Sequence, residues 1–362
     1  MKTRELKPNV HSVGAIDWDA RLFDRLIPLP DGTSYNAYVV RGSEKTALFD
    51  TVDPAKTPVL LNNMVKIGVD KLDYIIAHHG EQDHSGSLSD VLLMYPDAKI
   101  VTNPRCKQML IDLLDIEEDK FVTVDDGQTL SLGDKTLQFV YTPWVHWPET
   151  MSTYVIEDKV LFSCDFFGAH LATSSLFVDD EGAVYEAAKR YYAEIMMPFR
   201  KQINANLAKL DELDVEIIAP SHGPEYDKPA FIIDAYKDWV SDSVKNKVVV
   251  PYVSMHGSTG AMVSHFVDAL IDRGIMVKQF ELSTVDIGKL AVELVDAASV
   301  VIGSFGWGGR TVEQLTGLMS NLKVELLEPV LVKGQPREAA FVAIDRLADE
   351  ILAKHKEAGI VN

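Results

Sequence analysis

The sequence contains only two cysteines, Cys106 and Cys164, and they do not form a CxxC pair. This scarcity argues against a disulfide framework, a cysteine-ligated zinc ion and an iron–sulfur cluster, and it fits a reducing cytoplasm. The sequence also lacks an apolar run of the roughly 18 residues that a membrane-spanning helix needs. It begins MKTRELKPNV, without the apolar stretch of a secretion signal. We therefore expect a cytoplasmic protein that does not span a membrane.

Basic residues are scarce relative to acidic ones, since 35 Lys and Arg against 54 Asp and Glu give a net charge of −19. Phosphate groups would be repelled at long range, so we do not expect a nucleic-acid partner. The remaining composition, with 47% hydrophobic and 25% charged residues, is typical of a globular protein. A length of 362 residues suffices for two domains, each with its own core.

Residues 1–246 read as one domain, in which short apolar runs alternate with irregular connections. Helical patterns at Pro58–Ile67 and Tyr185–Leu213 lie between these runs. We interpret the apolar runs as buried β-strands. They are Tyr35–Val40, Thr46–Asp50, Tyr74–Ala77, Lys99–Thr102, Leu137–Tyr141, Val160–Ser163 and Val215–Ala219.

Residues 247–362 show a regular alternation of strand and helix patterns after the polar stretch 240–247. Such alternation predicts a parallel sheet with helices on both faces. The expected strands are Val248–Val253, Met276–Leu282, Ser299–Ile302 and Lys323–Val332. The expected helices are Ala261–Arg273, Lys289–Ala297, Val312–Asn321 and Arg337–Ala358.

The segment His-Gly-Glu-Gln-Asp-His at 79–84 places four possible metal ligands within six residues, directly after the strand Tyr74–Ala77. Regular structure would point such close neighbours in different directions, so we predict a loop here. Three further candidates also follow expected strands. If all these strands belong to one sandwich, seven side chains converge at one edge of its sheets. They are His79, Glu81, Asp83, His84, His146, Asp165 and His222.

A single histidine is more often an ordinary structural residue than a metal ligand. His78 stays ambiguous on this ground, because its position is offset from the alternation that His79, Glu81 and Asp83 share. An ordinary structural role does not account for seven candidates in the same strand-end context.

The pattern HxExDH, followed by a later histidine, aspartate and histidine, resembles the metallo-β-lactamase superfamily, whose usual members are zinc hydrolases. Glu81 stands where those hydrolases have a second histidine, which is the variant found in flavodiiron proteins. A carboxylate in place of an imidazole makes the site harder and more anionic, which favours iron over zinc. The run Trp144–Met151 around His146 also resembles this family, and we expect Trp147 to form a wall of the pocket.

The resemblance implies a fold class and a ligand arrangement. The fold is an α/β protein with a metallo-β-lactamase-like αββα sandwich, followed by a flavodoxin-like parallel-sheet domain. One iron takes His79, Glu81 and His146, and the other takes Asp83, His84 and His222. Asp165 bridges the two irons, and no catalytic residue is expected beyond the metal ligands.

A second motif joins the strand Val248–Val253 to the following helix. Its hydroxyl groups, small residues and helix N-terminus suit a phosphate group, although such loops also serve as plain turns. It resembles the flavodoxin phosphate loop, and no GxGxxG fingerprint is present. A later glycine-rich segment resembles the second flavin loop of the family. The expected FMN-binding residues are Ser254, Met255, His256, Gly257, Ser258, Thr259, Gly260, Ser304, Phe305, Gly306, Trp307 and Gly308.

The second domain departs from the flavodoxin pattern near Ser304–Phe305, where the strand Ser299–Ile302 runs straight into the second flavin loop. The domain is short by about one βα unit, roughly 30 residues. Two explanations stay open: a true deletion, or a segment that is missing from this sequence. Either way, the change concerns flavin binding and leaves the metal motif intact.

The resemblance implies that an external donor reduces FMN and that FMN reduces two irons, which convert dioxygen to water or nitric oxide to nitrous oxide. The donor could be rubredoxin, another flavoprotein or a deazaflavin coenzyme, and the sequence contains no fused rubredoxin module. The family pattern also implies a head-to-tail homodimer or a dimer of dimers. Two alternatives stay open: a zinc-dependent hydrolase, and a flavodoxin-like electron carrier with an inactive metal domain.

Overall fold

A computed structural model of the chain describes residues 4–301, 303, 310–319 and 323–361. Contacts divide the chain into two compact units, Met1–Ser241 and Asp242–Asn362. Among the described residues, no helix is long and apolar enough to cross a membrane. The two units are described separately below.

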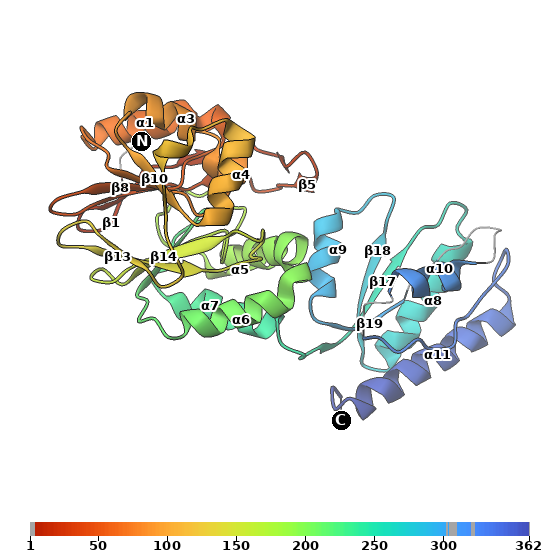
Figure 1. Cartoon of the computed structure of the whole chain (residues 1–362). Helices are drawn as coiled ribbons and strands as arrows, with labels where there is room; N and C mark the ends of the chain where they lie inside the picture. The colour runs from red at the N-terminus through yellow and green to blue at the C-terminus, as the bar shows by residue number, and fades with distance from the viewer. Residues whose placement is uncertain (1–3, 302, 304–309, 320–322, 362) are drawn as a thin grey trace. The chain divides into compact units, whose positions relative to one another are not determined.

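The first unit has four layers, with two β-sheets packed face to face and helices outside each sheet (Figure 1). One sheet has the strand order β1-β2-β7-β8-β9-β10-β11. Its strands are β1 (Arg4–Lys7), β2 (Val10–Ser12), β7 (Tyr38–Arg41), β8 (Thr46–Phe49), β9 (Tyr74–Ile76), β10 (Lys99–Thr102) and β11 (Phe121–Thr123). The other sheet consists of β12 (Thr129–Ser131), β13 (Thr136–Tyr141), β14 (Met151–Val155), β15 (Val160–Cys164) and β16 (Ile217–Pro220). This arrangement confirms the αββα sandwich expected from the sequence.

Figure 1 places helices α1 (Thr57–Lys66), α3 (Leu88–Met94) and α4 (Pro104–Leu114) on the outer face of the first sheet. On the outer face of the second sheet lie α5 (Glu181–Tyr191), α6 (Arg200–Leu210) and α7 (Pro229–Trp239). Successive residues of a strand point to opposite faces. Leu48 and Ile75 therefore pack in the core on the helix side, while Phe49 and Ile76 pack between the two sheets. Each large apolar side chain buried in this way contributes about 1.5–3 kcal/mol.

Parallel pairing within each sheet decides where the strand ends lie. Strands β8, β9 and β10 run parallel to one another, as do β15 and β16. Their carboxyl ends therefore meet at one edge of each sheet. The segment after β9 and the residues after β15 and β16 emerge at this edge, and the sandwich brings them together.

Two sequence predictions in this unit were wrong. The segment 79–84 is not entirely a loop, because Gln82–Ser85 forms the one-turn helix α2 that buries both Asp83 and His84. The helix expected over Tyr185–Leu213 is divided into α5, a π-helical segment Tyr192–Met196, a 3₁₀ turn Met197–Phe199 and α6. Pro198 lies at the break and lacks the N–H that a continuous helix would use.

The second unit contains a parallel sheet of order β18-β17-β19, made of β17 (Lys245–Tyr252), β18 (Met276–Glu281) and β19 (Ala297–Val300). Its helices are α8 (Ser258–Asp272), α9 (Ile287–Leu294), α10 (Thr311–Leu318) and α11 (Glu338–Glu357). Val248 and Val250 pack against Phe266, Leu270 and Ile351 in its core. This order is the first part of a flavodoxin-like sheet, 2-1-3 of 2-1-3-4-5.

The strand expected at Lys323–Val332 is absent, because residues 323–332 have no regular secondary structure. In the flavodoxin order the last strand pairs with the fourth strand, and no described residue of this chain occupies that position. Without this neighbour, the backbone groups of 323–332 have no ladder to join.

Glu225 is a buried carboxyl group in the first unit and gives a pH-dependent prediction. Burial raises the pKa of Glu225 from its ordinary value of 4.5 to about 7, although Arg4 opposes the shift. When folding raises the pKa of a carboxyl group, that group does not destabilise the folded protein below its unfolded pKa. Its contribution to stability is then lost as the pH rises through the folded pKa. We expect Glu225→Gln to unfold at the same temperature as the wild type near pH 4.5, and several degrees higher at pH 8, a gain of up to about 3 kcal/mol.

Thermal melts at the two pH values test this expectation. Glu216→Gln is the control, because Glu216 is a surface carboxylate that pairs with Lys7 and Lys159. Equal melting of the Glu225→Gln variant and the wild type at pH 8 would show that Glu225 carries no such cost.

Candidate metal centre

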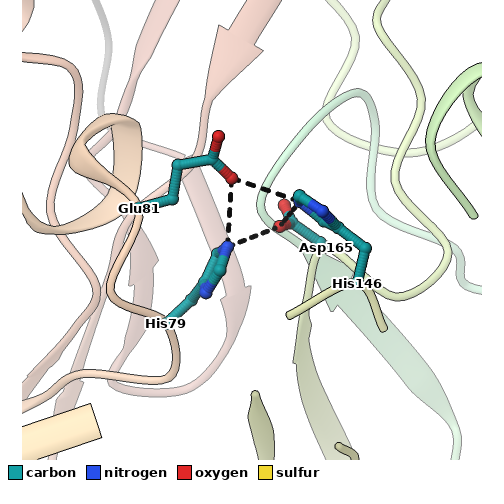
Figure 2. Close-up of side chains that lie close together, drawn as sticks. All are labelled: His79, Glu81, His146 and Asp165. Carbon is teal, nitrogen blue, oxygen red and sulfur yellow. Dashed lines mark hydrogen bonds and ion pairs between the residues drawn. The ribbon is translucent and has the colours of Figure 1, made fainter. Parts of the chain in front are cut away.

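Three segments of the first unit bring four side chains together at the sheet edge. His79 and Glu81 come from the segment after β9, His146 from the β13–β14 connection and Asp165 from the end of β15. Figure 2 shows the four side chains pointing toward one another. Glu81 Oε2 lies 3.1 Å from His79 Nε2 and 3.1 Å from His146 Nε2. Asp165 Oδ2 lies 3.5 Å and 3.3 Å from the same two nitrogens.

A second group lies beside the first and contains Asp83, His84 and His222. Asp83 presents one oxygen to each histidine: Oδ1 lies 3.2 Å from His84 Nε2, and Oδ2 lies 3.2 Å from His222 Nε2. Asp165 Oδ1 completes the group at 3.0 Å from His84 Nε2 and 3.3 Å from His222 Nε2. The structure thus brings all seven residues singled out in the sequence to one place.

Asp165 belongs to both groups. Its Oδ2 faces His79 and His146, whereas its Oδ1 faces His84 and His222. Two ligand atoms at right angles on one metal, each about 2.1 Å from it, are about 3.0 Å apart. The separations in both groups are close to this value, so the geometry fits two adjacent metal ions that share one carboxylate.

The hydrogen-bonding state of these atoms also fits metal ions. Several are buried and lack a hydrogen-bond partner among the described residues. A buried polar atom without a partner is costly, so a site that collects several of them calls for a cation. These atoms are both carboxylate oxygens of Asp83 and of Asp165, and the Nε2 atoms of His84 and His222.

The carboxylates determine the protonation of the histidines. Burial by itself lowers the pKa of His146, but the facing carboxylates of Asp165 and Glu81 raise it to about 9. Burial likewise opposes the charge on His222, while the facing carboxylates of Asp165 and Asp83 raise its pKa to about 10. Histidine must lose this proton to bind a metal, so protons and metal ions compete for the same nitrogens.

The non-ligating sides of two histidines are held by other groups. His79 Nδ1 lies 2.7 Å from Glu149 Oε1, and His222 Nδ1 lies 2.7 Å from the carbonyl oxygen of Ser34. Both contacts leave Nε2 free to face the centre. His84 is positioned through its backbone, because its carbonyl oxygen accepts hydrogen bonds from Thr51 N and Thr51 Oγ1, each at 2.7 Å.

His78 has a structural role. Its Nδ1 lies 2.7 Å from Asp50 Oδ2, and its Nε2 lies 2.8 Å from Thr153 Oγ1. Its backbone N–H donates to Asp50 Oδ1 at 2.8 Å. Both ring nitrogens are therefore occupied, and the ambiguity left by the sequence is resolved.

Aromatic rings lie beside the centre. The Trp147 ring lies 4.9 Å from that of His79. His170 lies 4.8 Å, ring to ring, from each of Phe23, Tyr191 and His222. Burial and the nearby His222 hold the pKa of His170 well below its usual value, so its ring is neutral.

Sequence reasoning missed several of these residues. Glu149 lies within the run 144–151 noted above, and an acidic residue three positions after a ligand histidine was the available signal. Asp24 gave no signal, because a hairpin of β4 (Leu22–Phe23) and β5 (Ile27–Pro28) carries it to the centre. Burial and a hydrogen bond to Glu81 raise the pKa of Asp24 to about 7.

In the second unit, the expected phosphate loop connects β17 to the N-terminus of α8. Ser254 Oγ accepts a hydrogen bond from Gly260 N at 2.9 Å, and Met255, His256 and Gly257 are exposed. Gly257 has a φ of 83°, which favours glycine, and no atom lies within 4 Å of the position where a Cβ would be. The open N-terminal end of α8 suits a phosphate.

The end of β19 lies beside this loop, since Gly303 bridges Tyr252 and its missing Cβ would lie 3.4 Å from Thr259. The predicted flavin residues Ser304, Phe305, Gly306, Trp307 and Gly308 lie outside the described residues.

Comparison with known proteins agrees with this architecture. A family model described as ODP family beta lactamase matches residues 33–223. The nitric oxide reductase of Moorella thermoacetica is 37% identical over 303 residues, which cover 82% of this chain and 75% of that protein.

Solved structures match along nearly the whole chain. The rubredoxin oxygen:oxidoreductase from Desulfovibrio gigas has a TM-score of 0.94 and 29% identity, covering 98% of this chain and 99% of that chain. The flavodiiron protein from Giardia intestinalis has a TM-score of 0.90 and 27% identity, with 98% of each chain covered. With its two-group metal centre and flavodoxin-like second unit, this chain belongs to the flavodiiron protein family, whose first unit is metallo-β-lactamase-like.

Proposed function

We propose that this chain is an oxidoreductase that passes electrons from an external donor through FMN to two irons, where dioxygen, nitric oxide or both are reduced. The observation that supports this most strongly is the placement of Asp165, whose two oxygens face two separate groups of ligand atoms. One carboxylate between two groups is the arrangement that a pair of metal ions requires.

In this proposal one iron is held by His79, Glu81 and His146, and Asp165 bridges it to the other. The second iron is held by Asp83, His84 and His222. When bound, the irons and the flavin supply the electron transfer that side chains cannot perform. Each iron has four protein ligands, counting the bridge, so positions are left for a diatomic molecule.

The protein's own residues hold and shield this chemistry. Glu149 and the Ser34 carbonyl fix the ring orientations of His79 and His222. Trp147, Phe23 and Tyr191 line the centre with apolar surface, which keeps bulk water from it. Reduction inside such a pocket releases fewer reactive side products.

Glu81 separates this proposal from a zinc hydrolase. It faces both His79 and His146 at 3.1 Å, so the position where zinc hydrolases have an imidazole carries an additional negative charge. Three carboxylates with four imidazoles form a hard ligand set that suits iron. The completeness of this set also argues against an electron carrier with an inactive metal domain.

Elemental analysis of purified protein tests the identity of the metal. We expect about two irons per chain after expression in iron-sufficient medium, since each of the two ligand groups holds one ion. Consumption of dioxygen or nitric oxide by the reduced protein is expected to accompany the iron. Stoichiometric zinc without iron, even after growth in iron-rich medium, would overturn the assignment.

FMN is assigned to the second unit, with its phosphate at Ser254–Gly260 and its ring at the segment that includes Ser304–Gly308. The exposed N-terminus of α8 and the positive φ of Gly257 support the phosphate position. Because the domain lacks about one βα unit, we expect FMN to be held less tightly than in a complete flavodoxin-like domain.

The surface around the metal centre suggests that a second chain covers it. The β4–β5 hairpin packs Phe23 toward His222, while Leu22 and Leu26 on the same hairpin are 57% and 79% exposed. Trp144, two residues before His146, is 41% exposed. Exposed apolar side chains of this size are available to take part in a protein interface. We propose a head-to-tail homodimer, alone or paired into a tetramer, in which the flavin of one chain serves the irons of its neighbour.

The same proposal includes a cytoplasmic location and a reduced donor protein or coenzyme. Both cysteines are buried and free, which suits a reducing compartment. Rubredoxin, another flavoprotein and a deazaflavin coenzyme are the candidate donors, and reduction of the purified protein by each can be followed by flavin bleaching.

A further inference from the structure

Two histidines of the metal centre are supported by groups of different charge. His79 Nδ1 contacts a carboxylate oxygen of Glu149 at 2.7 Å. His222 Nδ1 contacts a backbone carbonyl oxygen, that of Ser34, at the same distance. The two contacts orient the rings in the same way, but only the first one adds a negative charge.

Glu149 is held firmly in this position. Its side chain is fully buried, and the same Oε1 accepts a hydrogen bond from Gly80 N at 3.1 Å. Its carbonyl oxygen accepts a hydrogen bond from Asn103 Nδ2 at 2.6 Å. A carboxylate that accepts hydrogen bonds from a histidine N–H and a backbone N–H is stabilised in its charged form. These two contacts hold the Glu149 carboxylate behind one of the assigned ligand histidines.

A carboxylate that accepts the Nδ1 proton makes the imidazole a stronger electron donor at Nε2. A neutral carbonyl has a weaker effect of the same kind. The additional charge is buried, where electrostatic interactions are poorly screened. The additional negative charge should therefore stabilise a metal cation at the position that His79 serves. It should stabilise Fe(III) more than Fe(II), because Fe(III) carries the higher charge.

We propose that Glu149 makes the two iron positions unequal. As a positioning residue, it strengthens metal binding at the His79–Glu81–His146 position and stabilises ferric iron there relative to the Asp83–His84–His222 position. When one electron enters the diferric centre from reduced flavin or a chemical reductant, it reduces the iron at the second position first. This inference rests on the proposed function, because it assumes the ligand assignment given above.

A purely structural role has to be distinguished, since Glu149 also ties the 79–81 segment to the β13–β14 connection. Asp50 offers a matched control, because it contacts His78, the residue directly before His79. It binds His78 Nδ1 and His78 N at 2.7 Å and 2.8 Å, so it repeats the carboxylate–histidine–backbone arrangement on a histidine that is not an assigned ligand. Asp50→Asn and Glu149→Gln each remove one buried charge and keep the side-chain size.

Single-iron proteins reveal which position Glu149 affects. The His222→Ala variant is expected to keep the iron at the His79–Glu81–His146 position. The His146→Ala variant is expected to keep the iron at the Asp83–His84–His222 position. In the His222→Ala background, Glu149→Gln should weaken ferrous iron binding by about 10–100-fold, the usual effect of losing such a partner. It should also raise the Fe(III)/Fe(II) potential there. In the His146→Ala background both quantities should stay unchanged, and Asp50→Asn should change neither.

Equal weakening of iron binding in both backgrounds, or an equal effect of Asp50→Asn, would show that Glu149 is merely structural. If Glu149→Gln fails to fold, Glu149→Asp retains the charge and should keep the inequality. The two single-iron proteins must in any case differ in potential, with the His222→Ala protein lower. Two irons with equal affinity and equal potential in the wild type would overturn this inference alone. A protein that binds no iron would overturn the proposed function.

Discussion

Replacing Asp165 with alanine is expected to empty both metal positions and to abolish the reduction of dioxygen and nitric oxide. Asp165 is the one assigned ligand that faces both groups, with Oδ2 toward His79 and His146 and Oδ1 toward His84 and His222. Its loss removes one of three negative charges that offset two cations. Removing a partner from a buried ionic group leaves the rest uncompensated, which is strongly unfavourable.

His222→Ala serves as the comparison, because His222 belongs to one group only. We expect this variant to retain about one iron per chain and the Asp165→Ala variant close to none, since only a bridging ligand serves both ions. Iron content by elemental analysis gives both values, and circular dichroism shows whether the fold persists. Loss of both irons in every single-ligand variant alike would remove the distinction. Activity of Asp165→Ala near the wild-type level would refute the bridge.

The sequence predicted the convergence of the seven candidate ligands because most of them follow strands. Asp165 follows β15 and His222 follows β16, and these two strands pair in parallel, so their ends had to meet. The segment 79–84 follows β9 in the opposite sheet, and the face-to-face packing brings it to the same edge. Apolar strand patterns in the sequence were sufficient to predict this convergence.

The residues that support the ligands could not be predicted in the same way. Asp24 and Ser34 reach the centre through the hairpin and strand of an N-terminal segment, and their approach depends on tertiary packing. Ser34 contributes a backbone carbonyl, for which no side-chain pattern exists. The helical turn at Gln82–Ser85 was missed because four residues carry too little periodicity to reveal it.

The prediction of a strand at Lys323–Val332 was wrong although the local sequence pattern was present. Its sequence is apolar and suited to a strand, but β-structure needs a neighbour to pair with. The described sheet ends at β19, so no described strand lies beside residues 323–332 to pair with them. Local sequence therefore indicated an element that the tertiary context of this chain does not support.

The flavin site can be disabled without touching the irons. Gly257 and Gly274 flank the two ends of α8, both have a positive φ, and neither has an atom within 4 Å of the Cβ position. Valine at either position costs about the same backbone strain, at least about 1–2 kcal/mol. Gly257→Val should lower FMN affinity more than about tenfold, because the loop relaxes and its N–H groups turn away from the phosphate. Gly274→Val should leave FMN binding unchanged, as measured by flavin fluorescence titration.

Mixing this variant with Asp165→Ala tests the head-to-tail dimer. Asp165→Ala alone is expected to be inactive, and Gly257→Val alone to lose most of its activity at an FMN concentration near the wild-type Kd, where its flavin site is mostly empty. In a mixed dimer, the intact flavin of the Asp165→Ala chain faces the intact irons of the Gly257→Val chain. Random assembly makes half of the dimers mixed, and each keeps one of two working centres, so co-expression should restore about a quarter of the wild-type activity.

Two controls make this outcome decisive. The Gly274→Val chain co-expressed with Asp165→Ala should give about half of the wild-type activity, because the irons of every Gly274→Val chain receive electrons from an intact flavin in both kinds of dimer. Sequential affinity purification with a different tag on each of the two chains must show that mixed dimers form. Mixed dimers that form and yet stay inactive would show that each flavin serves the irons of its own chain. In that case the exposed Leu22, Leu26 and Trp144 would not mark an interface through which electrons pass between chains.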